Sequence, residues 1–194
     1  MRSYGQVLSA ATALTLVVNA TPIAHNTTLR ARDETFKLFV YNNCPFVKEV
    51  STYTVTADFQ MVLMSPPTNI QPHGGELVIS TPFHATGMRL TGHAEWTNQW
   101  APTLLFEYGY SAYMGVEGTA YDISMMAGSD PDIGMGVWPI ENGQGSGSCA
   151  QKIAWPWNAP LGQAWTNPDQ DRDGSPADTV CYKGKTDFKV VYCP

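Results

Sequence analysis

Two short segments of alternating apolar residues lie near the two ends of this chain, and each runs into a cysteine. The first covers residues 36–41 (FKLFVY) and leads to Cys44, and the second covers residues 187–192 (DFKVVY) and leads to Cys193. Alternation with a period of two is typical of a strand that buries one face. We therefore expect the two ends of the domain to form strands that pair with each other.

Further strand-like segments, each bounded by Gly, Pro, Asn or Ser, fill the interval between these ends. They cover residues 50–56, 75–80, 88–91, 104–108 and 121–126. No segment keeps apolar residues at helical spacing through three turns, and no internal repeat is visible. The pattern predicts an all-β, antiparallel sandwich or flattened barrel, with long surface loops at residues 130–148 and 155–178.

The amino-terminal region has the features of an exported protein. Residues 7–18 form an apolar run that is too short to span a membrane, and the small-residue pattern Val18-Asn19-Ala20 follows as a cleavage site. We expect a signal peptide at residues 1–20, a disordered arm or pro-segment at residues 21–34 with a glycosylation sequon at Asn26, and one domain at residues 35–194. The expected location is extracellular or cell-wall associated.

The charge balance excludes one class of partner. The chain has 11 Lys and Arg against 17 Asp and Glu, which gives a formal charge of −6. A protein that binds nucleic acid needs a basic surface to neutralise phosphates, so nucleic acid is not an expected partner. After the signal peptide no apolar run is long enough for a membrane span, and we expect a monomer.

The four cysteines, Cys44, Cys149, Cys181 and Cys193, are an even number in a chain with an export signal, so two disulfides are expected. Their spacings of 105, 32 and 12 residues do not fit a zinc site, whose paired ligands lie closer together. Three connectivities are possible on the residues alone. A bond between Cys44 and Cys193 would close nearly the whole domain, which the chain-entropy relation values at about 4 to 5 kcal/mol.

Several segments together resemble the thaumatin-like protein family over most of the domain. FKLFVYNNC at residues 36–44 is similar to the family's first strand and TDFKVVYCP at residues 186–194 to its closing strand, while GGELVI, PTLLFEY and YDIS are similar to strands between them. The resemblance implies the disulfides Cys44–Cys193 and Cys149–Cys181. The chain lacks the family's cysteine-rich second domain, and this short form is similar to small secreted fungal antigens of the yeast-phase-specific type.

The same resemblance implies an acidic cleft, which some family members use to bind or weakly cleave β-1,3-glucan. Glu107 and Asp122 match the first two acidic positions, the third falls on Ala127, and the basic position falls near Arg89 or Thr91. We expect the protein to bind the polysaccharide β-glucan of a cell wall, or to act as an antigen that contacts a host surface protein. The alternative is a weak β-1,3-glucanase in which Glu107 and Asp122 are the catalytic carboxyl pair.

Trp155, Trp157 and Trp165 are further candidates for ligand binding, because a flat aromatic ring can stack on a sugar. Pro156 argues against a central strand at this point, so at least one of these rings is expected on the surface. The competing interpretation is that the rings close the end of the sandwich by packing.

Two metal hypotheses also arise. Asp169, Asp171 and Asp173 alternate ahead of Gly174, as at the start of a calcium loop, but Val180 stands where an EF-hand has its bidentate Glu. These residues form either an irregular calcium site or a solvated acidic turn, and no other cofactor is expected. If export cleavage instead followed Ala24, His25 would become the amino terminus and could bind copper together with His73, His84 or His93.

Overall fold

The computed structural model describes residues 35–58, 60–83, 85, 87–91, 104–113, 115–126, 133–140, 149–160, 162–170, 179–181 and 184–194. The predicted signal peptide, arm and Asn26 sequon lie outside these residues. Within them, no helix is long and apolar enough to cross a membrane.

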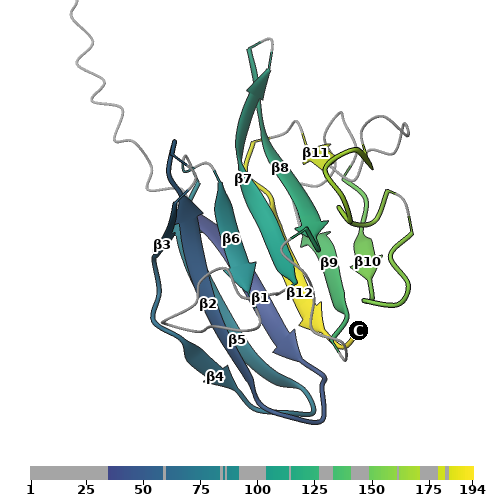
Figure 1. Cartoon of the computed structure of the whole chain (residues 1–194). Helices are drawn as coiled ribbons and strands as arrows, with labels where there is room; N and C mark the ends of the chain where they lie inside the picture. Colours follow the sequence, from purple (N-terminus) through teal and green to yellow (C-terminus); the bar gives the residue numbers. More distant parts are fainter. Residues whose placement is uncertain are drawn as a thin grey trace, which may run out of the picture. The chain divides into compact units, whose positions relative to one another are not determined.

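The strands of the described residues form two sheets (Figure 1). The five-stranded sheet has the order β10-β9-β12-β1-β5, and it consists of β1 (Thr35–Asn42), β5 (Gly75–Pro82), β9 (Met135–Ile140), β10 (Lys152–Ala154) and β12 (Asp187–Tyr192). The seven-stranded sheet has the order β11-β8-β7-β6-β2-β3, with β4 beside β2. Its strands are β2 (Lys48–Val55), β3 (Met61–Leu63), β4 (Thr68–Ile70), β6 (Met88–Thr91), β7 (Leu105–Tyr113), β8 (Val116–Ser124) and β11 (Thr179–Cys181). The prediction of an all-β sandwich is confirmed.

The two sheets pack against each other through aromatic side chains. Phe188 of β12 contacts Phe106 of β7 and Tyr121 of β8, with ring centroids 5.0 and 4.9 Å apart. Phe36 of β1 meets Tyr108 of β7 edge-on at 5.3 Å. All five rings are buried. Since side chains alternate along a strand, the residues between these positions lie on the outer faces of the sheets.

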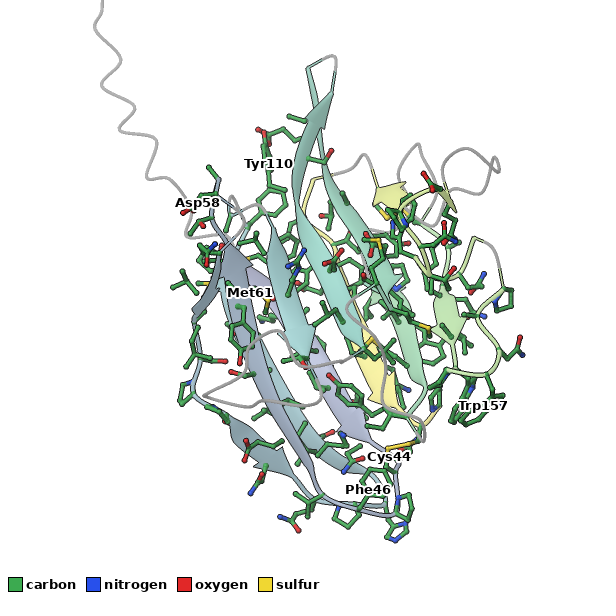
Figure 2. The ribbon with its side chains drawn as sticks, in the orientation of Figure 1. Cys44, Phe46, Asp58, Met61, Tyr110 and Trp157 are labelled. Carbon is green, nitrogen blue, oxygen red and sulfur yellow. A yellow bond between two sulfur atoms is a disulfide. The ribbon has the colours of Figure 1, made fainter. Side chains whose placement is uncertain are left out.

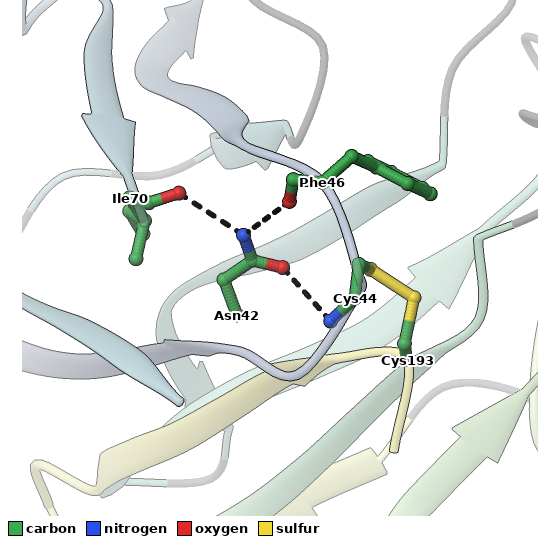
Figure 3. Close-up of a disulfide and its surroundings, with 5 residues drawn as sticks. All are labelled: Asn42, Cys44, Phe46, Ile70 and Cys193. Atoms are coloured by element: carbon green, nitrogen blue, oxygen red, sulfur yellow. Dashed lines mark hydrogen bonds between the residues drawn. A yellow bond between two sulfur atoms is a disulfide. The ribbon is translucent and has the colours of Figure 1, made fainter. Parts of the chain in front are cut away.

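The central strands β1 and β12 are parallel, which corrects the expectation of a wholly antiparallel sandwich. Leu38 pairs with Phe188 and Asn42 with Tyr192, so both strands end at the same edge of the sheet. Cys44 and Cys193 follow these ends and are joined by a disulfide (Figure 3). The second disulfide joins Cys149 to Cys181, so the structure contains the two pairs that the resemblance implies.

Asn42, at the end of β1, is fully buried and fixes the path of the chain beside the first disulfide (Figure 3). Its Nδ2 donates hydrogen bonds to the carbonyls of Phe46 and Ile70, at 2.8 and 3.0 Å. Its Oδ1 accepts a hydrogen bond from the backbone N–H of Cys44 at 3.0 Å. All the side chain's polar atoms are therefore satisfied by groups that are close only in the folded chain.

The strand β9 lies inside residues 130–148, where the sequence analysis expects a surface loop, so that expectation is wrong for this segment. Met135 and Val137 are fully buried, and β9 pairs with β12 on one side and β10 on the other. Gly134, just before the strand, and Gly136 within it make this segment look like a loop in the sequence. They are required because a Cβ on Gly134 would overlap the ring of Trp155, and one on Gly136 would overlap Trp138.

Candidate functional site

Three charged residues lie in one row across neighbouring strands of the seven-stranded sheet. Arg89 of β6 pairs in register with Glu107 of β7, and Glu107 pairs with Asp122 of β8. The flanking residues of each strand, such as Leu90 and Phe106, are buried in the core, so the three charged side chains lie on the outer face. The structure thus brings Glu107 and Asp122, two of the acidic positions that the resemblance assigns to the cleft, together with Arg89, whereas Thr91, the other candidate for the basic position, is buried.

The charges in this row offset one another in part. Two carboxylates directly opposite each other on antiparallel strands, with Cα atoms about 4.5–5.5 Å apart, repel. Arg89 lies on the other side of Glu107, and its Nε is 2.5 Å from Oε1 of that carboxylate. Both side chains are 20% exposed, so ligand can still reach them. The ion pair fixes the direction of the Glu107 carboxylate, which suits a group that accepts hydrogen bonds from a ligand.

The row borders a groove with a volume of about 280 Å³, which we call the acidic groove. The next position on the same face carries Gly109 opposite Ala120, and these small residues leave the space beside Glu107 and Asp122. Sequence reasoning missed this pair. Neither residue belongs to a motif, and only the register of β7 and β8 shows that they are neighbours.

The strand beneath the groove is held by a buried tyrosine. Tyr108 points into the core between Glu107 and Gly109, and its hydroxyl lies 3.0 Å from the Thr81 hydroxyl of β5 in the other sheet. Burial raises the pKa of Tyr108 well above its ordinary value, and the bond to Thr81 offsets only part of that effect. The contact ties the middle of β7 to the opposite sheet.

The three tryptophans that the sequence analysis groups together have different surroundings. Trp157 is 67% exposed and lies at the periphery (Figure 2), and its ring centroid is 4.9 Å from that of Trp155. Two backbone hydrogen bonds between Trp155 and Asn158 close the turn that presents this pair. Trp165 is only 9% exposed and bonds to the backbone at Ile123 and Met125, where it extends the edge of β8. Trp157 is therefore a surface ring that a ligand could reach, whereas Trp165 is a packed ring.

The acidic turn is only partly described. Asp169 is exposed, whereas Asp171 and Asp173 lie outside the described residues, as do Ala127, His25, His84 and His93. Gln170 is fully buried, and it accepts from the Thr166 backbone N–H and donates to the Ala164 carbonyl, which anchors this end of the loop. His73 is an exposed turn residue with a φ of 59°. Among the described residues, no group of three His, Cys, Asp or Glu side chains could hold a metal ion.

These features define a two-sheet β-sandwich with two disulfides and a charged groove on its seven-stranded sheet. No protein family and no curated protein matches the chain. The fold is similar to that in the crystal structure of the protein elicitor MoHrip2 from Magnaporthe oryzae, with a TM-score of 0.56 and 16% sequence identity. The likeness covers 82% of this chain and 99% of that one. At this identity the likeness concerns the fold alone.

Proposed function

We propose that this protein is a secreted thaumatin-like protein that binds a β-glucan of a cell wall in the acidic groove. The observation that carries the proposal is the row Arg89–Glu107–Asp122 beside a groove of about 280 Å³. The ion-paired carboxylate of Glu107, with the carboxylate of Asp122 beside it, is suited to accept hydrogen bonds from the hydroxyls of a neutral sugar. The two disulfides support secretion, because such bonds persist mainly in oxidising compartments.

A second candidate is weak hydrolysis of β-1,3-glucan. It is favoured by the register that places Glu107 opposite Asp122, since retaining glycosidases hold their two carboxyl groups about 5 Å apart. A host-directed role, in keeping with the elicitor name of MoHrip2, is the remaining alternative for this fold.

The experiment that separates these functions is incubation of the purified protein with insoluble β-1,3-glucan. A binding protein leaves the solution with the glucan and releases no reducing sugar. An enzyme releases reducing sugar, and Asp122→Asn abolishes the release. Failure of the protein to bind, with no sugar released, contradicts both glucan functions and leaves the host-directed role to be tested with host surface proteins.

A further inference from the structure

A second groove lies on the other sheet, on the face of β1, β9 and β12 that points away from the core. Its volume is about 310 Å³, and its lining combines rings and apolar groups with charged ones: Lys37, Phe39, Tyr41, Ile140, Asp187 and Lys189. We call it the lysine groove. Nothing in the sequence analysis points to it, because its residues come from both ends of the chain and from the strand that the sequence hides.

Lys189 lies at the centre of this groove and is held by aromatic rings. It pairs in register with Phe39 of β1 on one side and Trp138 of β9 on the other. Its Nζ is 5.1 Å from the ring centroid of Tyr41 and 5.8 Å from that of Trp138. Cation–π contacts of this kind orient an ammonium group, and N–H donors that do not face a ring stay available to a ligand.

Three further cations in the described part of the chain have polar partners of their own, and Lys48 is buried beside the ring of Phe46. Arg89 pairs with Glu107, Lys185 pairs with Asp187, and Lys152 is buried with its Nζ donating to the carbonyl of Gly162. Neither Lys37 nor Lys189 forms an ion pair within the described residues, and both are exposed. In a chain of net charge −6, two such lysines in one aromatic groove form a local positive site.

The one carboxylate of the groove does not neutralise these two ammonium groups. Asp187 is buried, and its Oδ1 accepts hydrogen bonds from the backbone N–H of Lys37 at 2.8 Å and from Nζ of Lys185 at 2.5 Å. Its charge is thus matched by Lys185. A ligand in the groove therefore meets the positive charges of Lys37 and Lys189 above a surface of rings.

We propose that the lysine groove binds a sugar that carries a carboxylate, as in a uronate-containing polysaccharide. The sugar's apolar face packs on Phe39 and Ile140, and its carboxylate accepts hydrogen bonds from Lys189 and Lys37. Such a site is distinct from the acidic groove, because its ligand is an anionic sugar and the ligand proposed for the acidic groove is a neutral one. A peptide could not bind here by strand addition, because β1 and β12 are interior strands of their sheet.

The test compares binding of the full mature protein to polygalacturonate and to its fully methyl-esterified form, which has the same sugar without the charge. We expect binding to polygalacturonate that weakens as salt rises, and much weaker binding to the ester. Lys189→Met, which keeps the apolar stem, should weaken binding about tenfold or more, while Lys189→Arg keeps the charge and most of the affinity.

Three results of the polygalacturonate experiment would overturn the proposal. They are no binding of wild-type protein to polygalacturonate, equal binding to the ester, and unchanged affinity in both Lys189→Met and Lys37→Met variants whose thermal unfolding matches wild type. Polyglutamate serves as the acidic-peptide probe. Binding to polyglutamate as tight as to polygalacturonate would show an anion site that does not recognise sugar, which also contradicts the proposal.

Discussion

Two segments without regular secondary structure are each held by one buried polar side chain. Asn42 closes the turn that leads to the first disulfide, and Gln170 anchors the segment before the acidic turn. Both are fully buried with their hydrogen-bonding groups satisfied. Loss of such a residue leaves several buried backbone groups without partners, which is costly.

Asn42→Ala is therefore expected to lower the free energy of unfolding by about 3 kcal/mol, because the carbonyls of Phe46 and Ile70 and the N–H of Cys44 lose their partner together. Urea unfolding measures the change. Asn69→Ala on β4, an exposed position, is the matched control and should change stability by less than about 0.5 kcal/mol. Equal effects of the two substitutions would contradict the role of Asn42.

The raised pKa of Tyr108 should make the free energy of unfolding depend on pH in the alkaline range. Burial raises its pKa in the folded state, while in the unfolded chain the phenol ionises near pH 10. The folded state then binds more protons, so the contribution of Tyr108 is complete below about pH 10 and is lost as pH rises above that value. In urea titrations at pH 8 and pH 11, Tyr108→Phe should lose less stability between the two pH values than wild type. An unchanged pH dependence would contradict this assignment.

The same substitution, Trp to Ala, can be made at the exposed ring of Trp157 and at the buried ring of Trp165, and its effects on stability can be compared. Trp157→Ala should leave the melting temperature nearly unchanged, since the ring is 67% exposed. Trp165→Ala should lower the free energy of unfolding by about 3 kcal/mol or more, because it empties a packed position. If Trp157→Ala also weakens glucan binding while stability stays unchanged, the Trp155–Trp157 pair belongs to the binding surface.

At the scale of the elements, the structure explains which strands the sequence could predict. The strands predicted at residues 36–41 and 187–192 lie within one residue of the observed bounds of β1 and β12, and β1 alternates regularly between buried and more exposed residues. Their parallel direction could also have been inferred, because two strands that both run into mutually bonded cysteines must end at the same edge. The strand β9 could not be predicted, since Gly136 and Pro139 lower its strand propensity. Pro139 is tolerated because β10 pairs only with the other half of β9.

The two disulfides should differ in their effect on stability. Cys44 and Cys193 are separated by 149 residues and Cys149 and Cys181 by 32, so the chain-entropy relation gives about 5 and about 4 kcal/mol. The paired substitution Cys44→Ala with Cys193→Ala should therefore destabilise the protein more than Cys149→Ala with Cys181→Ala. Urea unfolding of both variants, with circular dichroism to verify the fold, measures the difference. The reverse order would mean that native-state contacts outweigh loop closure.

At the scale of the whole molecule, the two sheets present two grooves of different character. The acidic groove on the seven-stranded sheet could be approached from the sequence only through resemblance, because Arg89, Glu107 and Asp122 are far apart along the chain and become neighbours through strand register. No pattern in the sequence indicates the lysine groove, because this groove depends on the pairing of β12 with both β1 and β9. Local patterns identify strands, whereas sites on a sheet face depend on which strands are adjacent.

The claim that the acidic groove binds β-glucan is tested most directly with the Glu107→Gln variant. Calorimetry measures the affinity of this variant for a soluble β-1,3-glucan oligosaccharide. We expect the binding free energy to weaken by about 1.5–3 kcal/mol, the usual value of a charge-assisted hydrogen bond, with the fold retained because the side chain faces the groove. Glu76→Gln, an exposed substitution on β5 of the other sheet, should bind as wild type does. Unchanged affinity of Glu107→Gln, with wild-type stability, would contradict the claim that the acidic groove is the glucan site.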